Sequence, residues 1–214
     1  MKRFCYRGQY HDSAVLDFIP TMEENIKDLL RAGKLFTATV FSFDYDNLFV
    51  YFECVDEPLS PLDLLPGIEK YMNEWPGEAQ KRWFVPMIDV YHSIQPEGDE
   101  VEHWHRKVHA TPKGQMSVMN LEKLSSYTFF HFQLQEEKPA SNGKHLSIWS
   151  SENVALLYGE TPDEGLKNPH KGILDTQNTP GGWAALMRPH FVIRPDGEIY
   201  HAATVLLTLS EADL

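Results

Sequence analysis

The chain has 214 residues, of which 19 are Lys or Arg and 31 are Asp or Glu, for a formal net charge of −12. Nucleic-acid binding depends on basic side chains that neutralise phosphates, and no basic stretch interrupts the acidic sequence, so a nucleic-acid partner is excluded. No apolar run approaches the roughly 20 residues that cross a bilayer, and the start lacks the apolar stretch of a secretory signal. We therefore expect a cytoplasmic protein without a membrane partner, with Cys5 and Cys54 as buried, reduced thiols.

The first residues predict a strand followed by a helix. Residues 2–10 are expected to form the strand. The helix is interrupted at Pro20 and restarts at the capping-box pattern of Thr21 and Glu24. Gly33 supplies the C-terminal cap.

The stretch 35–55 organises the rest of this half. Its side chains alternate over two runs rich in Phe, Val and Thr, which are joined by Asp and Asn residues at 44–47, and this pattern predicts an antiparallel hairpin. Helical spacing over 68–75 and a strand over 81–94 follow. The order β-α-β-β-α-β is that of a ferredoxin-like unit.

The second half is expected to echo the first without its first helix. A polar stretch over 98–109 reads as a helix that Pro112 and Gly114 break. The remaining expected elements are, in order, a strand over 127–136, a hairpin over 146–160, a loop-and-helix region over 161–182, a segment over 183–193, a turn over 194–197 and a strand over 198–209.

These elements predict an α+β fold in which two ferredoxin-like halves in tandem pack as an α/β barrel. The first half covers residues 1–95, and the irregular second half covers residues 96–214. A sheet with helices on one face leaves its other face to be covered, so a ligand site is expected between the two sheets.

Common catalytic signatures are absent from the sequence. It contains no glycine-rich phosphate loop, no G-x-S-x-G elbow, no C-x-x-C pair and no H-E-x-x-H helix. A nucleotide-dependent or serine-nucleophile mechanism therefore has no support from motifs.

A family resemblance is carried by the segment RWFVPMIDV, which runs from Arg82 to Val90, together with Pro20, Gly33 and the hairpin ending NLFVYFE. Over about the first ninety residues the chain resembles the L-rhamnose mutarotase family. The resemblance implies a ferredoxin-like fold, a homodimer, no cofactor and interconversion of sugar anomers by proton transfer. A monosaccharide is then the expected small-molecule ligand.

The family's catalytic Tyr and His, four residues apart on the first helix, fall on Ala14 and Phe18 in this sequence. Phe18 can pack against a ligand but cannot transfer a proton. Trp83 and Asp89 stand where the family has its Trp and Asp, and they are expected to contact the substrate. Another His must then act as acid and base, because anomer exchange moves protons near neutral pH.

The candidate proton-transfer residues are His131, His92 and His11. In a strand over 127–136, His131 shares one face with Tyr127 and Gln133, which would bind substrate if that face lines the barrel and are otherwise solvent-exposed. As strand residues, Asp89 and His92 point to opposite faces, so a bulge would be needed to turn both inward.

Residues 102–109 also invite a metal hypothesis. On a helix, Glu102, His105 and His109 would share a face at a spacing that suits a divalent cation. Polar helices of this kind are mostly solvated, so no metal site is predicted.

Three functions remain in view. The first is a cofactor-free sugar mutarotase or isomerase. The second is a non-catalytic binding or structural member of the α/β barrel superfamily. The third is a small-molecule oxygenase or heme-type protein of the wider superfamily, in which a His would ligate.

Overall fold

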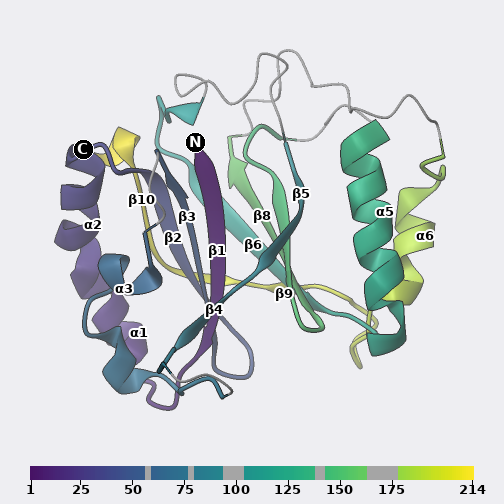
Figure 1. The fold of residues 1–214 in the computed structure, drawn as a ribbon, viewed down its shortest axis with the longest axis horizontal. Coiled ribbons are helices and arrows are strands. Elements are labelled where there is room, and N and C mark those ends of the chain that lie inside the picture. Colours follow the sequence, from purple (N-terminus) through teal and green to yellow (C-terminus); the bar gives the residue numbers. More distant parts are fainter. Residues whose placement is uncertain (56–58, 77–79, 94–103, 138–142, 163–177) are drawn as a thin grey trace. The chain divides into compact units, whose positions relative to one another are not determined.

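The computed structural model describes residues 1–55, 59–76, 80–93, 104–137, 143–162 and 178–214. The chain forms two compact units, and each contains its own antiparallel five-stranded sheet (Figure 1). The first unit comprises Met1–Met87, Glu100–Pro112 and Ala203–Leu214, and the second comprises Ile88–Asp99 and Lys113–Ala202. The units interleave along the chain, because two later segments return to the first.

The sheet of the first unit has the order β10-β2-β3-β1-β4, and every pairing in it is antiparallel. The hairpin and the first strand are confirmed. The end of the chain adds a strand beside β2 that was not assigned to this sheet from the sequence. The strands are β1 (Lys2–Gln9), β2 (Leu35–Phe43), β3 (Asn47–Cys54), β4 (Phe84–Pro86) and β10 (Thr204–Ser210).

The hairpin turn follows from its Asp and Asn residues. Tyr45 and Asp46 have φ of 62° and 57°, in the left-handed region, and of these two Asp46 is of a type that tolerates this region better than most. The Asn47 side-chain amide donates to the Asp44 carbonyl over 2.7 Å and closes the turn. The expected turn is therefore confirmed, and the side chain of Asn47, the first residue of β3, stabilises it.

Short helices cover one side of this sheet (Figure 1). They are α1 (Val15–Phe18), η1 (Ile19–Met22), α2 (Glu23–Arg31), α3 (Pro61–Leu64) and η2 (Ile68–Tyr71), and η5 (Glu211–Asp213) follows β10. The predicted cap at Thr21 is wrong, because its hydroxyl donates to the Phe18 carbonyl over 2.6 Å. The chain is already helical from Val15. Gly33, with φ of 66°, ends α2 as expected.

The core of the first unit lies between these helices and the sheet. Alternate residues of β3 point into it, including Leu48, Val50 and Phe52, and meet Ile19 and Ile26 from the helical side. Each of these five side chains is fully buried.

The opposite face of β3 carries a buried charged cluster. Tyr51 and Glu53 have no exposed surface, and the Tyr51 hydroxyl donates to the Glu53 carboxylate over 2.6 Å. Arg106 donates to both oxygens of that carboxylate, one of them from Nη2 over 2.9 Å. Burial, with the Glu53 charge beside it, raises the pKa of Tyr51 well above its usual value.

The sheet of the second unit has the order β5-β7-β8-β6-β9. The hairpin expected over 146–160 is confirmed as β7 and β8. The strands are β5 (Ile88–His92), β6 (Thr111–Val118), β7 (Ser147–Ser151), β8 (Val154–Thr161) and β9 (His201–Ala202). The helices are η3 (Leu121–Lys123), α5 (Leu124–Glu137), α6 (Trp183–Met187) and η4 (Arg188–His190), and α5 lies next to β5.

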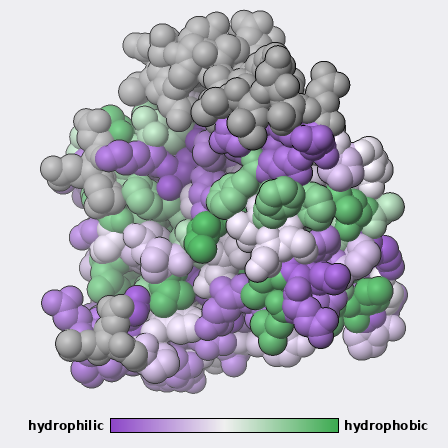
Figure 2. Space-filling view, turned by 45° about the vertical axis from the view of Figure 1, so that its right-hand side comes forward, coloured by the Kyte–Doolittle hydropathy of each residue, from purple (hydrophilic) through white to green (hydrophobic). Residues whose placement is uncertain are grey.

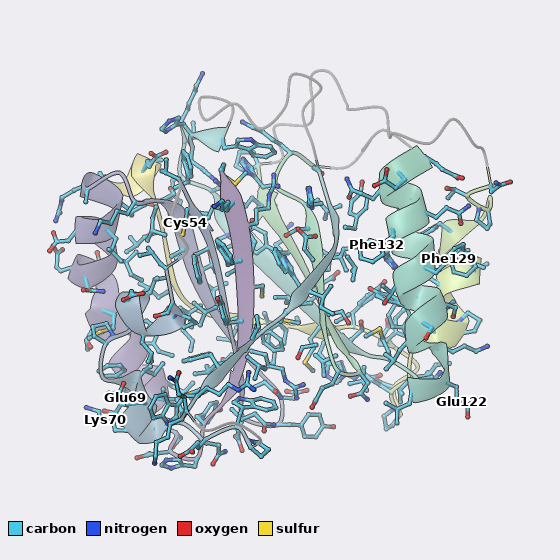
Figure 3. The ribbon with its side chains drawn as sticks, viewed as in Figure 1. Cys54, Glu69, Lys70, Glu122, Phe129 and Phe132 are labelled. Atoms are coloured by element: carbon cyan, nitrogen blue, oxygen red, sulfur yellow. The ribbon has the colours of Figure 1, made fainter. Side chains whose placement is uncertain are left out.

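The strand predicted over 127–136 is wrong, because these residues belong to the helix α5. The stretch contains a helical pattern as well as an alternating one: Tyr127, Phe130 and His131 lie at i, i+3 and i+4 and pack inward. Phe129 and Phe132, which are labelled in Figure 3, are 60% and 45% exposed. On the face of the molecule drawn in Figure 2, hydrophobic residues reach the surface among hydrophilic ones.

Another expectation for the second half needs correction. Pro112 and Gly114 do not end a helix but lie within β6. The segment over 183–193, which was given no secondary structure from the sequence, contains the helices α6 and η4. The helix predicted over 98–109 lies partly outside the described residues, and 105–109 are not helical. Most of the region 161–182 also lies outside them.

The α+β class is confirmed, with two antiparallel sheets and few helices. Two tandem ferredoxin-like halves and a closed barrel are not shown within the described ranges. Cys5 and Cys54 are buried free thiols. Of the helices that the structure describes, none has the length and apolar character needed to cross a membrane.

Candidate active site

A cavity of about 420 Å³ lies within the second unit. Helices α5 and α6 and the loop after η4 form one side of it, and β6, β7 and β8 form the other. It is lined by Gln115, Ser117, Tyr127, His131, Ile148, Ala155, Leu157, Trp183, Ala184, Ala185, Met187, Arg188, Phe191, Ile199 and Tyr200. Its size is within the range of small-molecule sites.

Tyr127 and His131 both line this cavity. They lie one helical turn apart on α5, with ring centroids 4.1 Å apart, and both are 3% exposed. The His131 Nδ1 lies 2.8 Å from the Tyr127 carbonyl oxygen, so Nδ1 carries the proton and donates. Nε2 then holds a lone pair, and within the part of the chain that the structure describes it makes no hydrogen bond.

Burial keeps this imidazole neutral. Loss of solvent is the largest influence on His131 and lowers its pKa from 6.5 to about 4. The hydrogen bond to the Tyr127 carbonyl raises the pKa, and nearby His190 lowers it further, with a net downward shift. At neutral pH the ring is therefore uncharged, and Nε2 carries a lone pair.

Apolar and aromatic side chains make the walls. The Trp183 ring stands edge-on to His131 at 5.2 Å, and the Phe191 ring stands edge-on to Tyr127 at 5.7 Å. Ile148 and Ala155 come from the sheet. Walls of this kind suit a flat, ring-containing ligand.

A few polar groups converge on the same space. Burial raises the pKa of Tyr127 and of Tyr200, so both phenols stay protonated and can donate hydrogen bonds. Tyr200 is 40% exposed, and Arg188 is exposed and donates to the Gly197 carbonyl over 3.3 Å. These two residues place donors at the rim.

Of the other residues predicted from sequence, two form a pair outside this cavity. The register of β5 against β7 shifts between Asp89 and Tyr91. This is the bulge that the alternation required, and it places the His92 Nδ1 2.8 Å from the Asp89 carboxylate. The backbone N–H of His92 donates to the Gln135 side chain over 2.9 Å. Neither Asp89 nor His92 lines the cavity.

The remaining predicted residues are also absent from the cavity lining. Gln133, on α5, donates to the Glu137 carboxylate over 3.2 Å. His11, Phe18 and Trp83 belong to the first unit, where His11 is exposed. The ring of Phe18 packs on Tyr71 at 5.1 Å, and Trp83 packs against the apolar core. Of the predicted site residues, the cavity brings together His131 and Tyr127.

Among the described residues no group of three His, Cys, Asp or Glu side chains could hold a metal ion. Glu102 of the considered cluster lies outside those residues. His105 and His109 instead contact carboxylates of the chain end, at 2.7 Å from Glu211 and 2.5 Å from Asp213.

Sequence reasoning missed Ser117, Arg188 and Tyr200 as members of the site. Ser117 lies on β6, which was not predicted as a strand because it contains Pro112 and Gly114. Arg188 and Tyr200 come from either side of the turn over 194–197. That turn was predicted, and it signals that the two flanking segments return to the same place.

No family model matches the chain, and no curated protein matches it. Similar solved structures include a "putative monooxygenase" from Lactobacillus acidophilus NCFM, with 6% identity and a TM-score of 0.44 over 98% of this chain and 95% of that one. Another is a "putative monooxygenase" from Fusobacterium nucleatum subsp. nucleatum ATCC 25586, with 8% identity and a TM-score of 0.48 over 99% and 95%. A third is an "anthrone oxidase-like protein", with 10% identity and a TM-score of 0.37 over 99% and 94%.

The predicted resemblance to the L-rhamnose mutarotase family is wrong, since these similar structures are named for oxidative enzymes and none for a mutarotase. The sugar isomerase activity that followed from it is withdrawn. The alternative of a non-catalytic binding or structural member finds no support either. At these identities and TM-scores the similarities do not define the reaction of this chain.

Proposed function

We propose that the second unit is an enzyme that binds a flat, ring-containing small molecule in the 420 Å³ cavity and removes a proton from it at His131. The observation that carries this proposal is a buried, neutral imidazole whose Nδ1 is fixed by a backbone carbonyl. That bond leaves Nε2 as the proton acceptor in an apolar space.

The shape and chemistry of the walls define the ligand class. Trp183, Phe191 and Ile148 offer apolar surface to the faces and edges of a ring system. A sugar would present hydroxyl groups all round to these walls and would lose their hydration without replacement. A hydroxylated aromatic ring presents one polar edge, which matches the position of the polar side chains.

Proton removal would be assisted by the surrounding groups. As negative charge develops on the substrate oxygen, the hydroxyls of Tyr127 and Tyr200 can donate to it. Both keep their protons because their pKa values are raised by burial. The substrate anion would in turn raise the pKa of His131, since opposite charges in a low-dielectric site stabilise each other.

Oxygenation of an activated ring CH₂ group is the reaction we propose to follow this step. Loss of the proton to Nε2 leaves a resonance-stabilised carbanion, which can give electrons to O₂. The CH₂ becomes a ketone, one oxygen atom enters the product, and the other leaves as water. All four electrons come from the substrate, so atoms and charge balance with O₂ as the co-substrate.

The test uses anthrone, a three-ring ketone with such a CH₂ group, and follows O₂ uptake together with ketone formation. Wild-type protein is expected to exceed the buffer rate, and His131→Asn is expected to lower kcat/KM by roughly 10²- to 10⁴-fold, the usual contribution of a positioned base. His92→Asn is the matched control, because His92 lies in the same unit but outside the cavity.

The outcomes separate the two parts of the proposal. No O₂ uptake, with proton exchange at the CH₂ group that depends on His131, would keep the base and reject the oxygenation. Equal loss in His131→Asn and His92→Asn, or no loss in either, would reject His131 as the base.

A further inference from the structure

The sheet of the second unit borders more than one cavity. A second cavity of about 360 Å³ shares Gln115 and Leu157 with it. These two residues lie on β6 and β8, which are neighbouring strands of the same sheet. Both cavities therefore open over one continuous surface of that sheet.

The pleat of the strands sets the direction of this surface. Side chains two residues apart on a strand share a face, so Ser117, Gln115 and Lys113 form one row along β6. Leu157 and Gly159 continue the matching row on β8. Four residues of a strand span roughly 13 Å, so the row runs from the ring-binding cavity at Ser117 to a cationic end at Lys113.

Lys113 and Glu160 bring side chains of opposite charge to that far end. Lys113 is exposed and forms no ion pair within the described ranges of the chain. Glu160 also lines the second cavity, and its carboxylate accepts the Tyr158 hydroxyl over 2.7 Å. The buried ring of His145 stands at the same end. An anionic group on a ligand would find its cation in Lys113.

We infer that the two cavities form one groove, and that the substrate is an elongated ring molecule with a carboxylate at the Lys113 end and its acidic ring position at the His131 end. This inference rests on the proposed function, since it takes the first cavity as the reactive site. Lys113 would then be a specificity-determining residue that positions the substrate without touching the reacting atoms.

The test compares two fluorescent probes with the same rings, 2-naphthol and 6-hydroxy-2-naphthoic acid, which adds a carboxylate at the opposite end. Dissociation constants are measured by titration with the full chain. The acid is expected to bind roughly fivefold more tightly, which is what a partly exposed ion pair supplies. Lys113→Met should remove this difference and leave 2-naphthol unchanged, whereas Lys123→Met, at an exposed lysine outside both cavities, should change neither.

A second variant tests the space rather than the charge. A Cβ added at Gly159 would meet nothing closer than Leu146 Cδ1 at 3.8 Å, so Gly159→Val fits the strand and narrows the far end of the groove. It should weaken binding of the acid and spare 2-naphthol. Equal affinities of the two probes for wild-type protein, or equal weakening of both by Lys113→Met, would overturn the inference while leaving the proposed function intact. Failure of both probes to bind would overturn the two together.

Discussion

One buried polar side chain in each unit, Glu53 in the first and His131 in the second, has very different surroundings. In the first unit, the Glu53 carboxylate is fully buried and is satisfied by Arg106 and Tyr51. In the second, His131 is almost as deeply buried, but it is neutral, and it borders an apolar cavity instead of a partner charge. A satisfied buried group holds a structure together, whereas a buried group that borders empty space is available to a ligand.

The largest effect on folding is expected from breaking the charged cluster of the first unit. Arg106→Leu removes the guanidinium that donates to both oxygens of the buried Glu53 carboxylate, and the free energy of unfolding should fall by about 3–5 kcal/mol. Denaturant unfolding followed by tryptophan fluorescence measures this change. The double variant Arg106→Leu/Glu53→Leu should recover most of the loss, because no charge stays buried. A single variant with wild-type stability would show that the cluster is not what stabilises this face.

A smaller effect is expected from acid on the second unit. His131 has a pKa of about 4 in the folded chain and about 6.5 when unfolded, so the unfolded chain binds the extra proton first. The stability that comes from keeping this ring neutral is complete above pH 6.5 and is lost as the pH falls towards 4. The loss should amount to about 3 kcal/mol. Unfolding curves of wild-type protein and His131→Asn between pH 7 and 4 measure it, and parallel curves for the two proteins would contradict the prediction.

The smallest effects on stability are expected from enlarging one alanine in each unit. Ala38 lies in the filled core of the first unit, and Ala155 lines the cavity of the second. Ala38→Leu should lower the free energy of unfolding by about 1–3 kcal/mol, because a packed core has no room. Ala155→Leu should leave it within roughly 0.5 kcal/mol or raise it, since the added groups fill space that is empty, and it should also block ligand binding. Equal destabilisation by both variants would mean that the cavity wall cannot take a larger side chain.

The elements that were predicted correctly are those with one consistent local pattern. The hairpin over 35–55 combines alternation, β-branched residues and a turn that needs Asp or Asn, and the structure has all three. The helix α5 was missed because aromatic and polar residues at 127–135 satisfy two periods at once. Packing of its inner side against β5 and Phe191 favours the helix, and that information lies far away in the sequence.

Two residues of the site, Tyr127 and His131, were predicted from the sequence, but the structural reason given for them was wrong. Tyr127 and His131 do share a face, but they do so as helix residues four apart and not as strand residues. Strand alternation predicts that Asp89 and His92 can turn to the same side only through a bulge, and the structure has a bulge between Asp89 and Tyr91. The contributions of Ser117, Arg188 and Tyr200 depend on tertiary contacts between segments that are distant along the chain, which no local pattern encodes.

The pairing of β10 with β2 has a consequence for synthesis on the ribosome. The edge of β2 that pairs with β10 stays unpaired while roughly 160 further residues are added. At about 5–20 residues per second this takes on the order of 10–30 s. During that time the hairpin of β2 and β3 presents unpaired backbone groups to other nascent chains, a known route to aggregation. The strand β10 is thus the one that closes this edge.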